Sequence, residues 1–507
     1  MYKKDFVYKV SASTDSGSQK IFYIIVFAGV VMAMLFGLFA VTANPIIISL
    51  AIALLAGTIL LVRPTWIIWL ILILGLLTGG VIPIFFEHIA TRLYWGIALL
   101  GFLLMFIAFI QISLSSSMRK GAPTFIWIAL GFMVYAVLNS LIQWHSAGEF
   151  LTGSKRYFQM WGLLFALCWL VREDLDIRRF RVFLLFVALV QLPFVVYQHI
   201  FLGPQKAALG GLSFDVIGGT FGTGIITGGN DAEMAVFLLI TLAFLLARQK
   251  ENVLPINRFI LLSPLVVAPL FLSETKAIFI MLPLMFLVLY RYEILKRPHY
   301  GLIALIFCLL LVVIMGYIQL DRTHLYMSSS KAGSFSALVE NTLSYNVYSQ
   351  GWSRNFLNRT TVLSFWADNQ GIHDPASFLF GNGLGSSHDG TGGHIAKRYP
   401  GYGIGLTTVS TLLWDMGIFG LGLFVTIFVL AWCCADRLRR ESAMPTVRAD
   451  AAAIQAAIGL FAFYIFYRIG MLEIVSFQIV FATVLGYLAW LYRRHVLATT
   501  DNNDLPK

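Results

Sequence analysis

Long apolar segments recur along most of the chain, and short polar segments separate them. Each apolar segment holds roughly 20 residues, the length that a helix needs to cross a hydrocarbon core of about 30 Å. The pattern lacks the short alternating segments of a transmembrane β-barrel. The sequence therefore predicts an all-α fold, a polytopic transmembrane helical bundle of about 14 spans.

These spans divide the chain into three regions. Residues 1–319 hold eleven spans, residues 320–405 form a large periplasmic loop, and residues 406–507 hold three spans and a cytoplasmic tail. The spans are expected at residues 21–43, 45–62, 65–84, 94–114, 124–143, 157–171, 182–201, 232–247, 259–272, 277–290, 301–319, 406–434, 451–467 and 471–491.

The long loop stands out in this organisation. A loop of this length is usually functional or disordered, and its many aromatic residues indicate order. Arg359, Leu363 and Trp366 follow one another at i, i+4 and i+7, the spacing of one helix face. We therefore expect residues 320–405 to be partly helical and to cap a cavity that opens outward.

Composition and charge fit a membrane protein. The chain is 59% hydrophobic and 12% charged, whereas about a quarter of a soluble domain is charged. The net charge of +11 could indicate nucleic acid, but with the N-terminus inside, 24 of the 36 Lys and Arg residues fall on the inner side. We expect a bacterial-type inner-membrane protein with both termini cytoplasmic, a lipid bilayer around it and no nucleic-acid partner.

Neither a signal peptide nor a disulfide framework is expected. The first apolar segment, from about Ile21 to Ala43, follows four lysines and lacks a small-residue cleavage site, which indicates a span. All cysteines lie inside apolar segments, at Cys168, Cys308, Cys433 and Cys434.

Motifs of soluble enzymes are missing from the sequence. No P-loop, dinucleotide-binding glycine pattern, HExxH or CxxC stands in a usable context. His388 and His394 share a glycine-rich loop with Asp389, which fits either a metal site or solvated loop side chains. No acidic or histidine cluster has metal-ligand spacing, so no metal or other cofactor is expected.

Cationic residues at the predicted outer membrane edge are the clearest sign of chemistry. Charge at membrane depth is costly and is usually paired or functional, although a single cation can also snorkel to the headgroups. As a set on one side, these cations favour an anion site, because arginine grips phosphate oxygens with a rigid fork. The set comprises Lys155, Arg156, Lys276, Arg359 and Arg468, the last with Glu473 nearby.

Two glycine-rich segments could present backbone N–H groups to an anion. Residues 218–224 precede Asn230 and the eighth span, and residues 381–385 lie in the long loop. A re-entrant loop and a plain turn are the structural alternatives for these segments.

Four stretches within residues 150–425 resemble the O-antigen polymerase (Wzy) and O-antigen ligase (WaaL) superfamily. Their order and loop placement are similar to the family's pattern. The stretches are Tyr197-Gln198 with Gly219-Thr220-Phe221-Gly222 and Asn230; Ser273-Glu274-Thr275-Lys276-Ala277; Arg359 to Phe365-Trp366 with Phe380-Gly381-Asn382-Gly383-Leu384-Gly385; and Trp414-Asp415-Met416-Gly417-Ile418-Phe419-Gly420.

The resemblance implies glycan transfer at the periplasmic face from an undecaprenyl-pyrophosphate-linked donor, without a nucleotide sugar or metal. Arg359 stands where the family has a functional arginine, Lys276 matches loosely, and Arg156 is a candidate by its placement. The candidate bases for the acceptor hydroxyl are Asp231, Glu233, Glu274, His388 and His394. The candidate substrate-binding residues are Gly219, Thr220, Asn230, Gly383 and Trp366.

Departures from the family pattern bear on its two activities. No arginine precedes Gly219, and Lys276 is displaced by two positions from the family's arginine. Leu406 stands eleven residues before Gly417, where ligases have a histidine, and this favours a polymerase.

The leading expectation is therefore a membrane-embedded glycosyltransferase that polymerises O-antigen, capsule or exopolysaccharide units, with a chain-length regulator as a further candidate partner. One alternative is a ligase that transfers the glycan to lipid A-core or protein. A flippase or transporter is a second, but it needs polar residues through the midplane of several spans, and most spans are uniformly apolar. A structural envelope subunit has no reason to gather outer cations.

Overall fold

The computed structural model describes residues 63–115, 119–171, 173–210, 213–225, 228–273, 275–299, 357–371 and 373–503, with isolated positions in 23–30 and 301–313. In this described part the regular structure is helical and contains no strand, which confirms the all-α class. The chain divides into two compact units, Met1–Ile68 and Trp69–Lys507. The contacts below all lie within the second unit.

The helices run in chain order as α3 (Pro64–Ile73), α4 (Gly79–Phe85), α5 (Glu87–Leu114), α7 (Thr124–Ile142), α8 (Ala147–Phe158), α9 (Trp161–Trp169), α10 (Asp174–Tyr197), α11 (Gly203–Ala208), α12 (Asp231–Lys250), α13 (Ile256–Leu272), α14 (Ile278–Leu289), α15 (Arg291–Lys296), α18 (Thr361–Gln370), α19 (Pro375–Phe380), α20 (Thr408–Glu441), α21 (Pro445–Tyr467), α22 (Gly470–Glu473) and α23 (Val475–Asn503).

Seven described helical stretches are long and apolar enough to cross a membrane, and this agrees with a membrane protein. Predicted spans 21–43, 45–62 and 301–319 lie outside the described residues or nearly so, and the total of 14 stays a prediction. The seven stretches are Pro64–Ile82, Arg92–Leu114, Thr124–Ile142, Asp174–Ala208, Thr408–Glu441, Pro445–Tyr467 and Val475–Ala498.

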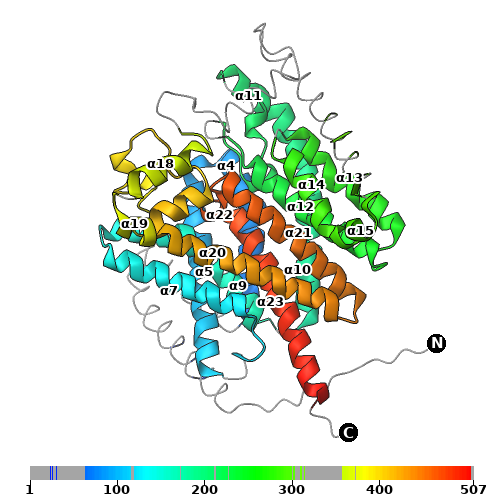
Figure 1. Ribbon diagram of the computed structural model, residues 1–507. Helices are drawn as coiled ribbons and strands as arrows, with labels where there is room; N and C mark the ends of the chain where they lie inside the picture. Colours follow the sequence, from blue (N-terminus) through cyan, green and yellow to red (C-terminus); the bar gives the residue numbers. More distant parts are fainter. Residues whose placement is uncertain are drawn as a thin grey trace, which may run out of the picture. The chain divides into compact units, whose positions relative to one another are not determined.

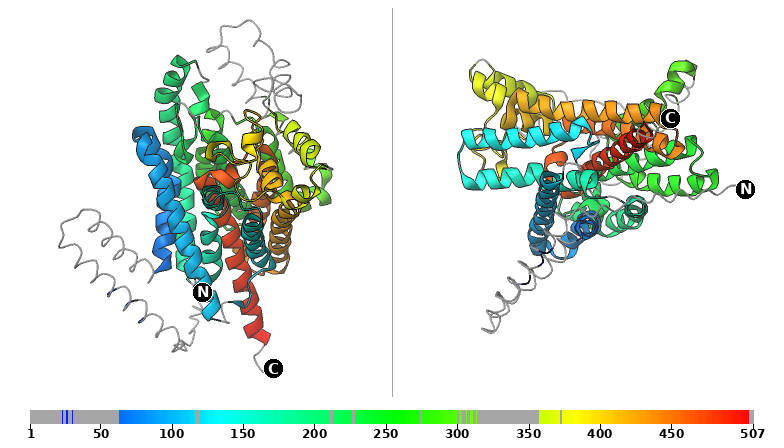
Figure 2. Two further views of the ribbon diagram at one scale, coloured as in Figure 1. Left: turned by 90° about the vertical axis from the view of Figure 1, so that its left-hand side faces the viewer. Right: turned by 90° about the horizontal axis from the view of Figure 1, so that it is seen from below.

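Helices α21 and α23 are the most enclosed of these seven. In their most apolar windows, 78% and 89% of the residues are buried, against 44% or less in the other five. Helix α21 packs against α12, α14 and α20, while α9 packs between α5 and α23. Helix α20 runs alongside α21 and α7 (Figure 1, Figure 2). The long helices of this unit therefore surround a central pair.

The prediction of one continuous span over residues 157–171 is wrong. The helix is interrupted at Gln159 and Met160, between α8 and α9. All nine residues of α9 are buried, but nine residues extend only about 14 Å and cannot cross a bilayer. Helix α8 is amphipathic and begins after its N-cap Ser146, whose hydroxyl accepts from the Glu149 N–H. The apolar run thus joins a buried half-helix to a polar helix.

A kink near the start of α20 brings two of the glycine-containing stretches together. Gly417 has φ 67° and ψ −172°, a conformation that only glycine adopts readily. A Cβ at Gly417 would overlap the Leu379 carbonyl, and a Cβ at Gly381 would overlap the Asp415 carbonyl. The Tyr135 hydroxyl of α7 donates to a backbone carbonyl in each segment at this crossing, that of Phe380 and that of Met416. The glycines therefore allow α19 and the loop after it to touch the α20 backbone.

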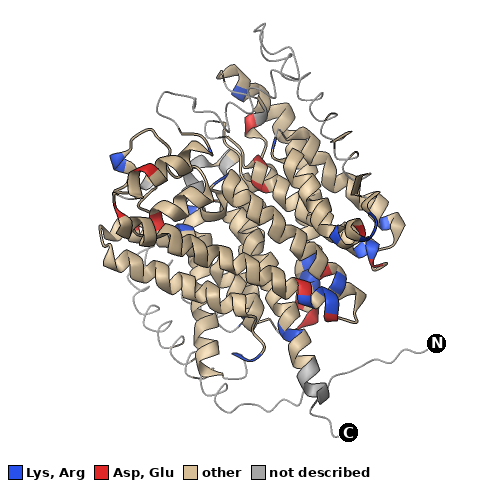
Figure 3. Cartoon of the chain, viewed as in Figure 1, with Lys and Arg blue, Asp and Glu red and all other residues tan. Residues whose placement is uncertain are grey.

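Charged residues gather toward helix ends in the described unit (Figure 3). Asp450, near the start of α21, accepts from Arg248 at 2.7 and 2.8 Å and from Arg181 at 2.8 Å. Arg448 donates to Glu251 at 2.7 Å. All three arginines therefore lie at the start of α21. The direction in which the bundle faces stays a prediction.

Candidate functional site

The other end of α21 leads into a short segment that joins it to α23. Arg468 ends α21 in an extended conformation (φ −151°, ψ 161°), and α22 follows. The Arg468 carbonyl accepts from the Thr408 hydroxyl at 2.8 Å and from the Thr408 N–H at 3.2 Å. The first turn of α20 is thereby fixed to the end of α21.

Arg468 is held by two carboxylates at the start of α12. Its Nη1 lies 3.2 Å from an oxygen of Asp231 and 3.2 Å from an oxygen of Glu233. The attraction of Glu233 raises the pKa of Arg468 above its usual range, so this guanidinium is always charged. Glu233 is fully buried and also accepts from the Tyr464 hydroxyl. Such an arrangement holds a cation in a fixed position at the end of α21.

Glu473 at the end of α22 joins a second cation to the same segment. Its carboxylate forms an ion pair with Arg156 of α8, and one oxygen lies 3.3 Å from the His388 Nε2. Burial raises the pKa of Glu473, while Arg156 opposes this effect. Burial lowers the pKa of Arg156, and Glu473 opposes that shift. Each group therefore stabilises the charged form of the other.

Arg359 approaches the end of α21 from the long loop. Its Nε donates to the Tyr467 carbonyl at 2.6 Å, and its guanidinium carbon lies 4.3 Å from the centre of the Tyr467 ring. Tyr467 directly precedes Arg468. Arg156 and Arg359, from distant parts of the sequence, therefore meet the short segment that carries Arg468. We call the following residues the charged cluster: Arg156, Asp231, Glu233, Arg359, His388, Arg468 and Glu473.

Asp415 of α20 holds the loop that carries His388. Each of its carboxylate oxygens accepts two hydrogen bonds, and the side chain is buried. One oxygen accepts from the Ser386 hydroxyl at 2.8 Å and the Ser387 N–H at 2.9 Å. The other accepts from the Tyr157 hydroxyl at 3.0 Å and the Gly385 N–H at 3.1 Å. Tyr157, next to Arg156, and Ser387, next to His388, thus donate to the same carboxylate.

The predicted catalytic residues are distributed unevenly around the charged cluster. Arg156 and Arg359 belong to it. Lys276 is half-buried next to Thr275, whose hydroxyl donates to Asp231 at 2.9 Å. Glu274 lies outside the described residues. His394 stands in the same loop as His388 but binds Glu149 of α8, which the sequence analysis did not consider.

Three predicted substrate-binding residues make hydrogen bonds within the fold. Gly219 has φ +57°, and its N–H donates to Gln198 at 2.8 Å. The buried Thr220 donates to the Leu76 carbonyl at 2.6 Å and accepts from Gln191 at 2.7 Å. Asn230 donates to the Phe221 carbonyl at 2.9 Å and directly precedes Asp231. This stretch therefore positions the start of α12, with its two carboxylates.

Gly383 and Trp366 likewise have contacts within the fold. The Gly383 N–H donates to the Asp415 carbonyl at 2.8 Å, and its φ is +92°. The buried Trp366 of α18 stacks on Phe378 at 4.6 Å and donates to Gln370 at 2.9 Å. Helix α18 begins at Thr361, so Arg359 precedes it, whereas a helix through Arg359 was predicted. Asn358 explains the start, because its side chain accepts from the Thr360 and Thr361 N–H groups at 2.9 and 2.8 Å.

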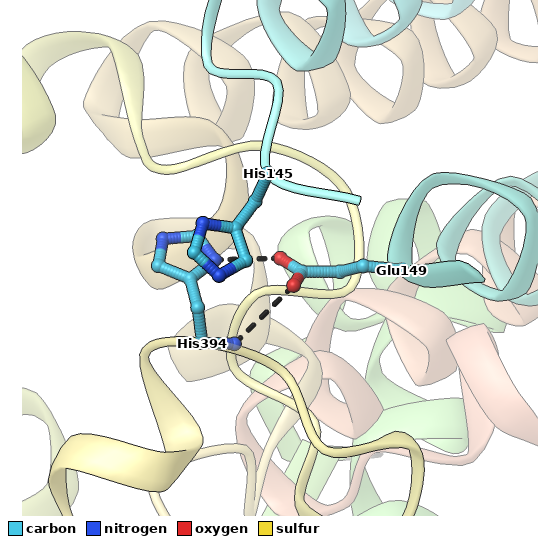
Figure 4. Close-up of side chains that lie close together, drawn as sticks. All are labelled: His145, Glu149 and His394. Carbon is cyan, nitrogen blue, oxygen red and sulfur yellow. Dashed lines mark hydrogen bonds and ion pairs between the residues drawn. The ribbon is translucent and has the colours of Figure 1, made fainter. Parts of the chain in front are cut away.

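A second polar group lies on the other side of the His388 loop. His145 precedes α8, Glu149 is in its first turn, and His394 comes from the loop (Figure 4). One Glu149 oxygen lies 2.7 Å from the His394 Nδ1, and the two histidine rings stack at 4.4 Å. We call these three residues the His–Glu–His site. The sequence analysis named His394, but for its two partners the only signal is the spacing of four between His145 and Glu149, which is common.

No protein-family model matches the chain, and a search of curated proteins finds no match either. The function is therefore inferred from the chemistry of the charged cluster.

Proposed function

We propose that this protein is a membrane-embedded glycosyltransferase of the polysaccharide polymerase type. It joins undecaprenyl-pyrophosphate-linked oligosaccharide units at the periplasmic face. The observation that carries the proposal is the approach of Arg156 and Arg359 to residues 467–473, the segment that carries the ion-paired Arg468. The resemblance of four sequence stretches to the Wzy and WaaL superfamily supports the same chemistry.

The arrangement suits a pyrophosphate leaving group. When the acceptor hydroxyl attacks the anomeric carbon, the bond from that carbon to the phosphate oxygen breaks and negative charge develops on the pyrophosphate. Fixed guanidinium groups stabilise this charge more in the transition state than in the ground state. In the resting protein Asp231, Glu233 and Glu473 neutralise part of the cationic charge. The donor would take over some of these contacts.

The acceptor hydroxyl loses a proton in the same step, and a base must receive it. His388 and Glu473 stand 3.3 Å apart beside Arg156, so either can accept a proton close to the bound pyrophosphate. Glu233 is a less suitable base, because its carboxylate is fully buried, whereas the Glu473 side chain is a quarter exposed. We assign the role of base to the pair of His388 and Glu473.

A ligase is the second candidate function. Ligases of the family have a histidine before the glycine of the α20 motif, and Leu406 stands there instead. His388 supplies an imidazole from another loop and lies beside Glu473. This contact favours keeping the ligase as a candidate. A flippase is less well supported, because the charged cluster stands at a helix end and not midway along the bundle.

The test uses lipid-linked oligosaccharides extracted from source cells that lack this gene and therefore accumulate the donor. The purified full chain is reconstituted in nanodiscs with this extract, and the glycans are separated by length on a gel. A ladder of repeat lengths with release of undecaprenyl pyrophosphate supports the polymerase. One transfer to added lipid A-core without a ladder supports the ligase. Donor that stays uncoupled with both acceptors overturns the proposal, provided that the reconstituted chain keeps its thermal unfolding transition.

A further inference from the structure

The His–Glu–His site gathers two imidazoles and a carboxylate from two separate segments. Its possible ligand atoms all lie within 4.8 Å of one another. His145 is exposed, Glu149 is buried, and His394 is half-buried, so the group is open on one side only. Figure 4 shows the two rings side by side and facing the carboxylate.

The local structure fixes two of these three side chains. Glu149 stands in the first turn of α8, one turn after the exposed His145, and the Ser146 cap holds this turn. The second Glu149 oxygen accepts from the His394 N–H at 3.3 Å. The His394 ring and its backbone are therefore both held by Glu149. The buried end of the group is preorganised, and the exposed imidazole is the part that can adjust.

We propose that the His–Glu–His site binds a divalent transition-metal ion of the Zn²⁺ class. Two imidazole nitrogens and one carboxylate oxygen match the ligand types of this class, whereas Mg²⁺ and Ca²⁺ prefer oxygen-only sites. Ligand atoms around tetrahedral zinc stand about 3.3 Å apart, given bonds of about 2.0 Å. The ligand atoms lie within 4.8 Å of one another, and His145, the exposed member, is the one that can adjust to this spacing.

A fourth ligand would be a water molecule or an added group. A cavity of about 10 Å³ is lined by His145, Ser146 and Glu149, among others, and has room for about one water molecule. Many zinc sites likewise have three protein ligands, with a water molecule or a substrate in the fourth position.

Metal binding would link α8 to the loop that carries His388. The His388 carbonyl accepts from the Gly393 N–H at 3.0 Å, one residue before His394. A bound ion therefore restrains the loop between these two histidines. The proposal does not depend on the proposed glycan chemistry, since it concerns the resting protein without donor.

The test is a titration of the purified, tag-free full chain in nanodiscs with Zn²⁺ and with Co²⁺. The expected result is one ion per chain, and tetrahedral-type visible absorption for Co²⁺. His145→Ala and Glu149→Gln are expected to weaken binding at least about 10-fold, a typical effect of losing support around a metal. His373→Ala is the matched control, because His373 is an exposed histidine of the long loop outside the site. It is expected to leave binding unchanged.

A second readout separates metal binding from folding. Hydrogen exchange of residues 385–394 is expected to slow on Zn²⁺ addition in the wild type and to stay unchanged in His145→Ala, whose exposed position makes it the mild variant. Three results overturn the proposal: no saturable binding by the wild type, equal affinity in the wild type and both site variants, or loss of binding only in Cys433→Ser. The last would assign the ion to the exposed thiol of α20.

Discussion

The guanidinium of Arg359 covers the ring of Tyr467 and donates to the carbonyl of the same residue. The ring centre lies 4.3 Å from the guanidinium carbon, and the hydrogen bond is 2.6 Å long. Through both contacts the long loop is held against Tyr467, the residue before Arg468. Arg359, which the sequence singles out, therefore lies next to Arg468, which pairs with Asp231 and Glu233.

We predict that Arg359→Ala lowers the rate of glycan polymerisation by about 10²–10³, the usual effect of losing one donor to a transition-state anion. Arg359→Lys is expected to be damaging too, because an ammonium lacks the planar fork that stacks on Tyr467. Glycan length on gels, normalised to the amount of protein in membranes, measures the effect. Arg398→Ala is the control, since Arg398 is exposed in the same loop. Wild-type polymerisation by both Arg359 variants would show that Arg359 is structural only.

Asp415 provides a prediction on stability. Asp415→Asn replaces one acceptor oxygen with an amide that faces N–H and O–H donors, so at least one buried hydrogen bond is lost. The expected cost is about 1–3 kcal/mol of unfolding free energy. Thermal unfolding of the detergent-solubilised chain measures it. Asp389→Asn, at an exposed loop position, should change the transition little. Equal unfolding of the two variants would contradict the role of Asp415 as an anchor for the His388 loop.

The kink of α20 gives a matched pair of glycine substitutions. Gly417→Ala forces a side chain into a conformation that costs about 1–3 kcal/mol, and the new Cβ would overlap the Leu379 carbonyl. Gly422→Ala lies in the same helix with nothing within 4 Å of its Cβ, and it is expected to be neutral or slightly stabilising. The amount of folded protein and its thermal unfolding distinguish the two. Equal stability of both variants would show that the kink is dispensable.

The sequence predicts helices well where apolar runs are long. Predicted spans 124–143 and 232–247 coincide with α7 and α12 to within three residues, and predicted span 451–467 ends with α21 but begins six residues after its start. It predicts breaks poorly, because the break at Gln159 has no proline or glycine signal and depends on how α8 meets the rest of the fold. The kink at Gly417 cannot be predicted from the sequence either. A glycine permits this conformation, but the close approach of the Leu379 backbone, a tertiary contact, is what requires it.

The candidate site follows the same division. The sequence singles out the cations Arg156, Arg359 and Arg468, because charge at a membrane edge is unusual. It does not predict their partners, since Arg156 and Glu473 are 317 positions apart and their pairing depends on tertiary contacts. It places both His388 and His394 among the bases and does not distinguish them, and in the structure the imidazole beside Glu473 is that of His388.

The predicted sidedness can be tested with two cysteines. In a chain whose native cysteines are replaced by alanine, Arg398→Cys is expected to react with a membrane-impermeant maleimide in spheroplasts. Met444→Cys is expected to react only after the membrane is permeabilised. Both positions are exposed, and the 34-residue helix α20 separates them. Labelling of both from the same side would contradict the topology, and labelling with the sides exchanged would invert it.

The buried carboxylate of Glu473 leads to a prediction of pH dependence. Burial raises its pKa above that of an exposed glutamate, so protonation begins closer to neutral pH. The groups that face it are Arg156, His388 and Arg468. When Glu473 is protonated, Arg156 and Arg468 are less neutralised and attract an anion more strongly. The affinity for undecaprenyl pyrophosphate is therefore expected to rise as the pH falls from neutral into the acidic range.

Glu473→Gln separates this effect from other titrations. The variant lacks the carboxylate at every pH, so it is expected to bind more tightly than the wild type at pH 7.5 and to depend less on pH. Protonation of the ligand itself contributes equally to both proteins and cancels in the comparison. His388→Gln in the same background should remove the remaining slope that comes from the imidazole. Glu441→Gln, at the far end of α20, serves as the control with an unchanged profile. If Glu473→Gln keeps the full slope of the wild type, the carboxylate does not control the charge of the cluster.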